Sequence, residues 1–300
     1  MDGIINIYKE KGYTSHDVVA VVRRTLKQKK VGHTGTLDPL AEGVLPICVG
    51  KATRLADYIM NGVKGYRANI TFGVTTDTQD AGGVVLERRP VSATRAEVEE
   101  CVRSFAGSYD QIPPMYSAIK VGGQRLYKLA REGEIVERKP RRVEIFEISV
   151  RKFISDTEAV IDVVCGKGTY IRALCADIGE KLGCGAYMSD LLRTRSGEFG
   201  IDDAIMLGRL HELAQEGRLE QCIIPPAHVL RQYKSVKVKG IAEKLLINGN
   251  KLRLDQITGK FRQEGQKPAE GECVVVYSNA DVPVALYRYD DGFLKSEIML

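Results

Sequence analysis

Residues 31–55 read VGHTGTLDPLAEGVLPICVGKATRL. Four glycines and two prolines interrupt an otherwise largely apolar run, so the backbone is permissive at some positions and fixed at others. Such a segment is typical of a loop that places a polar side chain at a cleft, although Asp38-Pro39, by its spacing alone, is more typical of a plain turn. The segment is not a phosphate-binding P-loop, because Gly50-Lys51 lacks the required G-x-x-x-x-G-K-[ST] spacing.

Strand and helix patterns flank this segment without a regular order. The clearest strand covers residues 66–74, where one face carries Tyr66, Ala68, Ile70, Phe72 and Val74. Further strands are expected over residues 3–8, 142–151 and 158–165, and helices after Thr14 or Ser15, after the capping box Thr94-x-x-Glu97 and over residues 171–182. Because these elements show no regular βαβ rhythm, we expect an α+β fold.

The chain has 300 residues, which is enough for about two domains. A connector is expected shortly before residue 231, around Ile223-Ile224-Pro225-Pro226. Beyond it, β-prone segments over residues 235–238, 273–278 and 284–289 are separated by turn-forming residues. We therefore predict a larger domain over residues 1–231 and a small β-rich domain over residues 232–300.

Composition narrows the class of protein. The chain contains 44% hydrophobic and 28% charged residues, which is typical of a soluble protein with a sizeable core. No window approaches the roughly 18 consecutive apolar residues of a membrane span. The first residues lack the basic and then apolar segments of a signal peptide. We therefore expect a cytoplasmic protein with no membrane partner. Seven cysteines without a C-x-x-C pair and four scattered histidines predict neither a disulfide framework nor a metal site. No cofactor is expected either, because the sequence holds no nucleotide or flavin motif.

Positive charge is concentrated in two runs, although the net charge is only +5. Their members are Arg23, Arg24, Lys27, Lys29 and Lys30 in the first, and Arg138, Lys139, Arg141 and Arg142 in the second. Runs of this kind are usually solvated faces. The alternative is a surface that follows the phosphates of a nucleic acid.

The segment GHTGTLDPLAEG (residues 32–43) closely resembles the catalytic motif of the TruB family of tRNA pseudouridine-55 synthases. Other motifs resemble the same family in the same order: KGY (64–66), TDTQD (76–80), PPMYSAIK (113–120), CGKGTYIR (165–172) and Leu191 in the strand that follows. The tail resembles the PUA RNA-binding module. The resemblance therefore spans essentially the whole chain, and several ordered motifs rarely coincide by chance.

The resemblance implies a catalytic domain with a mixed, largely antiparallel sheet and a PUA-like tail. It also implies an isomerisation of uridine 55 in the T loop of tRNA, in which the N1–C1′ bond breaks, the base rotates and C5 bonds to C1′. Asp38 is implied as the nucleophile, and attack on C6, attack on C1′ and removal of a C2′ proton all remain open. Each of these roles requires the ionised carboxylate.

Arg172 is implied as the partner of that carboxylate. A nearby guanidinium lowers an aspartate pKa by about 1–3 units, which would keep Asp38 charged in a desolvated pocket. Its planar fork also fixes the orientation of a carboxylate, which a lysine cannot reproduce. Taken alone, Arg172 would be interpreted as a surface arginine at a helix start, where the helix dipole disfavours it.

The resemblance further assigns contacts with a base turned out of the T loop. Tyr66 is implied to stack on the flipped base and is a candidate for removing the C5 proton, while Tyr170 and Leu191 line the pocket. His33 is implied to contact the RNA and to fill the space that the base vacates. Without the family, Tyr66, Tyr170 and Leu191 would each be interpreted as core residues.

The expected partner is tRNA, bound through its T stem-loop, with the basic runs facing phosphates and the C-terminal domain holding the acceptor stem. We expect a monomer with no obligatory protein partner. One alternative is a guide-RNA-dependent synthase subunit; members of that branch carry extra terminal segments, whereas this chain starts almost at its first strand. The other is a non-catalytic PUA-bearing RNA-binding protein or tRNA chaperone, against which the set Asp38, Tyr66, Tyr170 and Arg172 argues.

Overall fold

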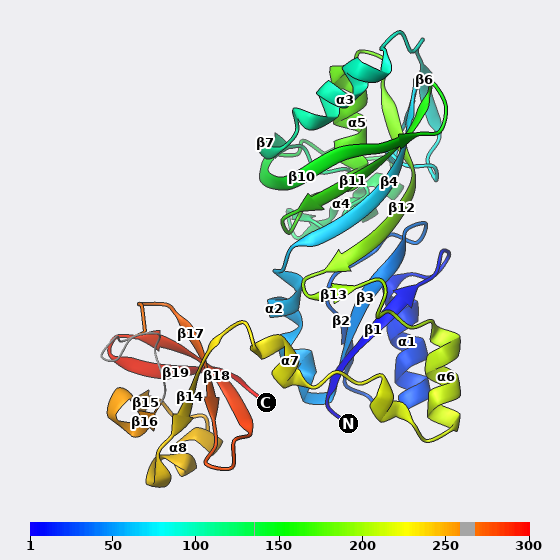
Figure 1. Ribbon diagram of the computed structural model, residues 1–300. Helices are drawn as coiled ribbons and strands as arrows, with labels where there is room; N and C mark the ends of the chain where they lie inside the picture. The colour runs from blue at the N-terminus through cyan, green and yellow to red at the C-terminus, as the bar shows by residue number, and fades with distance from the viewer. Residues whose placement is uncertain (135, 259–267) are drawn as a thin grey trace.

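One sheet organises most of the chain. The computed structural model describes residues 1–134, 136–258 and 268–300, and its largest sheet has nine strands (Figure 1). Seven of them lie side by side in the order β1 (Gly3–Lys9), β3 (Glu42–Val49), β12 (Ala186–Ser196), β4 (Lys64–Phe72), β11 (Glu158–Cys165), β10 (Arg141–Phe153) and β7 (Gly107–Gln111). The other two, β2 (Val31–His33) and β13 (Phe199–Gly200), pair with β3 and β12. Among the described strands of this sheet only β12 and β3 run parallel, so the predicted α+β fold with a mixed, largely antiparallel sheet is confirmed.

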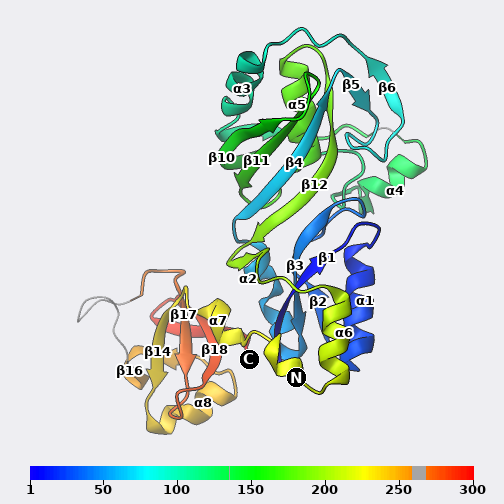
Figure 2. The ribbon, with the colours of Figure 1, turned by 45° about the vertical axis from the view of Figure 1, so that its right-hand side comes forward.

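Helices cover the two halves of this sheet separately. α1 (Ser15–Leu26) and α6 (Leu207–Gln215) pack beside β1 and β3, whereas α3 (Arg95–Arg103) and α5 (Ile171–Lys181) lie on the half formed by β4, β11 and β10 (Figures 1 and 2). α1 begins as predicted, because Thr14 caps it and forms a capping box with Asp17. Leu37 and Ala41, from the loop between β2 and β3, insert into the core of the second half, so this loop bridges the two halves.

β4 ends earlier than the sequence pattern predicts. Its apolar face, from Tyr66 to Phe72, packs in one cluster with α5. The prediction that Val74 continues this face is wrong, because Gly73 has a φ of +84° and turns the chain out of the sheet. Val74 instead starts β5 (Val74–Thr76), which pairs with β6 (Val85–Arg88). The turn that joins these two strands returns to the main sheet where Asp80 bridges to Met188.

The residues after position 231 contribute a second sheet of six strands, in the order β15 (Leu252–Arg253), β19 (Phe293–Met299), β18 (Pro283–Asp290), β17 (Cys273–Tyr277), β14 (Lys234–Val238) and β16 (Ile257–Thr258). This β-rich character agrees with the prediction. Together with α8 (Glu243–Ile247) the sheet encloses a core of its own. A further apolar cluster joins Leu55 and Leu230 to Ile298 across the two sheets. The domain boundary between residues 231 and 232 stays a prediction, because this cluster spans it.

The remaining elements are short. They are η1 (Gly50–Leu55), α2 (Ala56–Met60), β8 (Lys120–Val121), β9 (Gln124–Arg125), α4 (Leu126–Arg131), η2 (Leu219–Gln221), α7 (Pro226–Leu230), η3 (Gly240–Ala242) and η4 (Leu254–Gln256). None of the helices in the described part of the chain has the length and apolar character needed to cross a membrane.

Candidate active site

The loop between β2 and β3 presents Asp38 on a short, anchored turn. Ser15, in the first turn of α1, accepts the Leu37 N–H on its hydroxyl oxygen at 2.9 Å. The Ala41 N–H donates to the Asp38 carbonyl at 3.0 Å and closes a turn over Pro39. Asp38-Pro39 is therefore a turn, as its spacing alone indicates, and the turn is fixed to α1 on one side and to the core on the other.

Arg172, in the first turn of α5, forms an ion pair with Asp38. Its Nε lies 2.9 Å from Asp38 Oδ2, and its Nη1 lies 3.3 Å from Asp80 Oδ2. The guanidinium also donates to the carbonyl oxygens of Thr78 at 3.0 Å and Tyr116 at 2.9 Å. The Arg172 side chain is only 5% exposed, whereas that of Asp38 is 41% exposed. Two carboxylates offset the unfavourable helix dipole, and a guanidinium held by four partners fixes the Asp38 carboxylate in orientation.

The pKa of the Asp38 carboxyl is raised above its ordinary value. Desolvation by the surrounding protein is the main cause; Asp80 adds to it, whereas Arg172 and Lys9 oppose it. The expectation that Arg172 lowers the pKa is right for its own effect, but burial outweighs that effect. The side chain is 41% exposed, so Asp38 stays reachable from outside the protein.

Asp80 is one of two residues at this site to which the sequence reasoning assigned no role. Its side chain is 13% exposed and contacts Arg172. The Thr78 hydroxyl and the Gly82 N–H donate to Asp80 Oδ1 at 2.7 and 2.9 Å, so the second carboxylate oxygen is free to face the arginine. The sequence reasoning included Asp80 in the motif TDTQD (76–80) but gave it no role of its own. That motif was the available signal.

Tyr66 lies in β4 directly opposite Arg193 of β12. Burial raises the pKa of the Tyr66 phenol, while a hydrogen bond and the positive charge of Arg193 oppose the increase. Arg193 is 1% exposed and donates through Nε to the Val44 carbonyl at 2.7 Å, and more weakly to the carbonyls of Gly35 and Thr36, each at 3.4 Å. Arg193, which the sequence did not single out, therefore ties the Asp38 loop to the strand beside Tyr66.

The structure places the other predicted site residues, Tyr170, Leu191 and His33, in different surroundings. Tyr170 immediately precedes α5, and burial is the main cause of the raised pKa of its phenol, to which the charge of Asp38 adds. Leu191 is buried in the same apolar cluster as Leu37. His33 contacts none of the other predicted residues in the described structure; its ring packs edge-on against His16, with centroids 5.2 Å apart. The site thus joins Asp38 to Arg172, with Tyr170 at the start of the same helix. Tyr66 lies opposite Arg193, which is hydrogen-bonded to the Asp38 loop.

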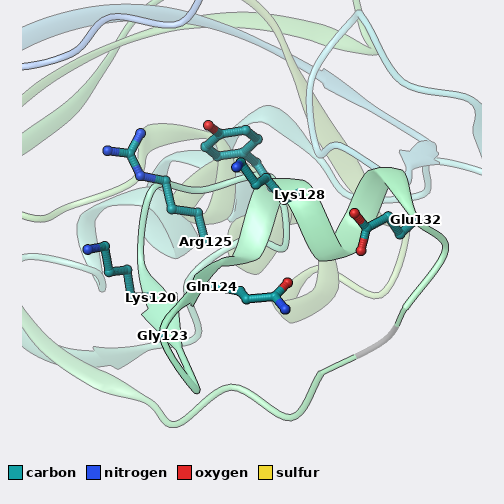
Figure 3. Close-up of a pocket in the computed structure, with 7 residues that line it drawn as sticks. Lys120, Gly123, Gln124, Arg125, Lys128 and Glu132 are labelled. Atoms are coloured by element: carbon teal, nitrogen blue, oxygen red, sulfur yellow. The ribbon is translucent and has the colours of Figure 1, made fainter.

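A hollow of about 490 Å³ lies on the segment that connects β7 to β10. Figure 3 shows Lys120, Arg125 and Lys128 around it, with Glu132 on its far side. This connecting segment is joined to the site through Tyr116, whose carbonyl oxygen accepts a hydrogen bond from Arg172. The sequence reasoning did not identify this cationic group. In the runs that it did identify, several arginines have partners within the protein, such as Arg23 on the Val31 carbonyl and Arg142 beside Asp110.

Comparison with known proteins relates the chain to one protein family. Residues 23–171 match the model of the TruB family pseudouridylate synthase N-terminal domain, and residues 172–231 match that of the tRNA pseudouridylate synthase B C-terminal domain. The chain is 50% identical to a tRNA pseudouridine synthase B of Clostridium perfringens, covering 100% of this chain and 99% of the other. It is 49% identical to one of Alkaliphilus oremlandii, covering 97% of this chain and 95% of the other, and 43% identical to one of Geobacillus kaustophilus, covering 89% and 99%.

Solved structures agree with this match. A structure of an H/ACA RNP bound to a substrate RNA containing 2′-deoxyuridine has a TM-score of 0.75 at 26% identity, covering 99% of this chain and 84% of the other. A structure of a Cbf5-Nop10-Gar1 complex has a TM-score of 0.74 at 27% identity, with the same coverage of 99% and 84%. Sequence motifs, site geometry and relatives point the same way, and the chain belongs to the TruB family of pseudouridylate synthases.

Proposed function

We propose that this protein converts uridine 55 in the T loop of tRNA into pseudouridine, with Asp38 as the nucleophile. The observation that carries the proposal is the 2.9 Å ion pair between Asp38 and the buried Arg172. Asp38 lies in the segment that matches the N-terminal family model, and Arg172 is the first residue of the segment that matches the C-terminal one. Relatives about 50% identical over nearly the whole chain are tRNA pseudouridine synthases, which supports tRNA as the substrate class.

The reaction is an isomerisation, so atoms and electrons balance within the nucleoside. The N1–C1′ bond breaks, the base turns, C5 bonds to C1′, and the proton on C5 is lost while N1 gains one. Ionised Asp38 adds to C6 or C1′, or removes the C2′ proton, and Arg172 holds the carboxylate at the angle that any of these steps needs. Because burial raises the pKa of Asp38, the two cations near it, Arg172 and Lys9, favour the charged form on which the step depends.

The target base must leave its stack before Asp38 reaches it. Unstacking costs a few kcal/mol, and one base–aromatic stack returns about 1–3 kcal/mol. We assign this stack to Tyr66, the rest of the pocket to Tyr170 and Leu191, and the RNA contact at the rim to His33. Tyr66 and Leu191 pack in the same apolar cluster as Leu37, the residue before Asp38, and Tyr170 lies two residues before Arg172, which supports this assignment.

Phosphates of the tRNA would be held by cations around the site. The cationic hollow formed by Lys120, Arg125 and Lys128 lies on a segment hydrogen-bonded to Arg172 through Tyr116, so a backbone bound there would lie next to the reacting base. We assign the acceptor stem to the C-terminal domain over residues 232–300. We further propose that the protein acts in the cytoplasm as a monomer, without an obligatory protein partner.

Purified protein and an unmodified tRNA transcript, with no other RNA or protein, test the proposal. We expect release of tritium from a [5-³H]uridine transcript, and no release from a transcript with cytidine at position 55. Asp38→Asn should abolish release and leave the Kd for tRNA within about twofold, because only the charge is removed. Retained turnover by Asp38→Asn would remove Asp38 from the nucleophile role.

A second candidate is a guide-RNA-dependent synthase, because the similar solved structures include an H/ACA RNP. It predicts no product from the purified protein alone, and product only after a guide RNA and its companion proteins are added. Release of tritium without these additions excludes it. The same result also excludes a non-catalytic RNA-binding protein or tRNA chaperone.

A further inference from the structure

Gln111, the last residue of β7, holds the main chain of Tyr170 at two points. Its Oε1 accepts the Tyr170 N–H at 2.9 Å, and its Nε2 donates to the Tyr170 carbonyl at 3.1 Å. The Gln111 residue is only 1% exposed. The side-chain amide therefore pairs with the N–H and the C=O of one residue as a neighbouring strand would, at a place where the described sheet has no further strand.

The residue that Gln111 holds is the N-cap of α5. Tyr170 is the N-cap residue, and its own side chain makes no capping bond. Its carbonyl accepts the first helical N–H, that of Leu174, at 3.0 Å, so Gln111 uses the second lone pair of the same oxygen. Arg172 follows two residues later and carries the guanidinium that orients Asp38. The position of Gln111 thus fixes both the aromatic residue and the arginine of the site.

The remaining bonds leave Gln111 only one orientation. Its Nε2 also donates to the Tyr109 hydroxyl oxygen, and that hydroxyl donates to Asp177 Oδ2 at 3.3 Å. Asp177 lies on α5 as well, so β7 is tied to the helix at its start and again further along. Since the Tyr170 N–H requires an acceptor, the amide cannot flip without breaking three hydrogen bonds.

We propose that Gln111 is a positioning residue for the isomerisation: it acts through Tyr170 and Arg172 to set the orientation of the Asp38 carboxylate. The proposal rests on the proposed function of the site. It goes beyond packing, because a merely structural glutamine would affect stability without changing the chemical step. Gln111 has no contact with Asp38 and touches no reacting atom.

The test replaces Gln111 with methionine, which has similar length and no hydrogen-bonding amide, and separately with asparagine, which is too short to keep both bonds. For both variants we expect kcat at saturating tRNA to fall by about 10- to 100-fold, because misplacing reacting groups by about 1 Å costs up to that much. KM and the Kd for tRNA should stay within about twofold. This split is expected because the amide lies behind the site and faces no RNA.

Asn6→Leu is the matched control. Asn6 is a buried amide that donates to the Gly200 carbonyl at 2.8 Å, on the half of the sheet away from α5. Its loss should lower the melting temperature and leave kcat within about twofold. A Gln111→Met or Gln111→Asn variant that keeps wild-type kcat, or that changes only KM, overturns the proposal.

Crystal structures of the Gln111 variants provide a readout besides activity. We expect the distance from Arg172 Nε to Asp38 Oδ2 to lengthen beyond 2.9 Å in both. An unchanged ion pair in either overturns the positioning role even if the protein proves inactive on tRNA. An inactive wild-type protein whose variants lose the ion pair would instead contradict the proposed function alone.

Discussion

The backbone of Arg193 passes so close to Gly43 that a Cβ on residue 43 would lie 2.2 Å from the Arg193 carbonyl oxygen. Gly43 also has a φ of +106°, a conformation that residues with a side chain rarely adopt. This is where β3 and β12 pair in parallel, with Arg193 opposite Gly43. The close approach joins the two halves of the sheet directly beneath the loop that carries Asp38.

Gly43→Ala should therefore destabilise the protein by about 2 kcal/mol or more, since both the steric clash and the backbone conformation oppose a side chain. Urea denaturation measures the change in the free energy of unfolding. Gly32→Ala in the same segment is the control, because a Cβ there meets no atom within 4 Å, and its effect should stay within about 0.5 kcal/mol. Equal stability of the two variants would contradict the close approach.

Arg172→Lys should fail to restore activity. One ammonium group cannot reach Asp38, Asp80 and the carbonyls of Thr78 and Tyr116 at once, so it leaves buried acceptors unpaired. We expect kcat to fall by roughly 100-fold or more, with affinity for tRNA little changed. Single-turnover assays at saturating protein measure this, and a rate near that of the wild type would show that charge alone suffices.

Tyr66→Phe should lose less activity than Tyr66→Leu, because a phenyl ring keeps the stacking surface and a leucine does not. The leucine variant should lose about 1–3 kcal/mol of base stacking, or roughly 10- to 100-fold in rate. The phenylalanine variant loses only the hydroxyl that interacts with Arg193. Measuring kcat/KM on tRNA distinguishes the two, and equal losses would show that the ring does not stack on the base.

Much of the fold follows from sequence periodicity, whereas much of the site does not. The alternation from Tyr66 to Phe72 predicts β4, and the capping residues Thr14 and Thr94 predict the starts of α1 and α3. These features depend on neighbours within a few residues. The end of β4 was predicted wrongly because a glycine within an alternating pattern does not reveal that its φ is positive.

Asp80 and Arg193 illustrate why site residues are harder to predict. Each acts on a segment far away in the chain, Asp80 on Arg172 and Arg193 on the carbonyls of Val44, Gly35 and Thr36. The sequence reasoning included Asp80 in the motif TDTQD (76–80) without assigning it a role, and it did not single out Arg193. Asp38 and Arg172 could be found only because whole motifs resembled a known family.

Binding of tRNA should weaken steeply with salt, and the cationic hollow should account for part of that slope. Replacing Lys120, Arg125 and Lys128 with glutamine should lower the slope of log K against log salt by roughly one for each phosphate that is no longer neutralised. Filter binding at several salt concentrations measures it. The same substitution of Lys27, Lys29 and Lys30 tests the first basic run, which we expect from the sequence to face phosphates. A slope that the Lys120, Arg125 and Lys128 variant leaves unchanged would argue against the hollow as a docking surface.

Asp177→Asn should stabilise the protein at neutral pH. Burial raises the pKa of Asp177 to about 6, from an ordinary value of 3.8. Between these two values the folded state binds more protons than the unfolded state, so the contribution of Asp177 to stability falls as the pH rises to about 6 and is constant above it.

Asparagine keeps an acceptor for the Tyr109 hydroxyl and carries no charge. With a discount for partial exposure, we expect a gain of about 1–2 kcal/mol at pH 7.5 and a smaller gain at pH 5. Thermal or urea unfolding at both pH values checks this, and a gain that does not vary with pH would mean that Asp177 does not titrate in this range.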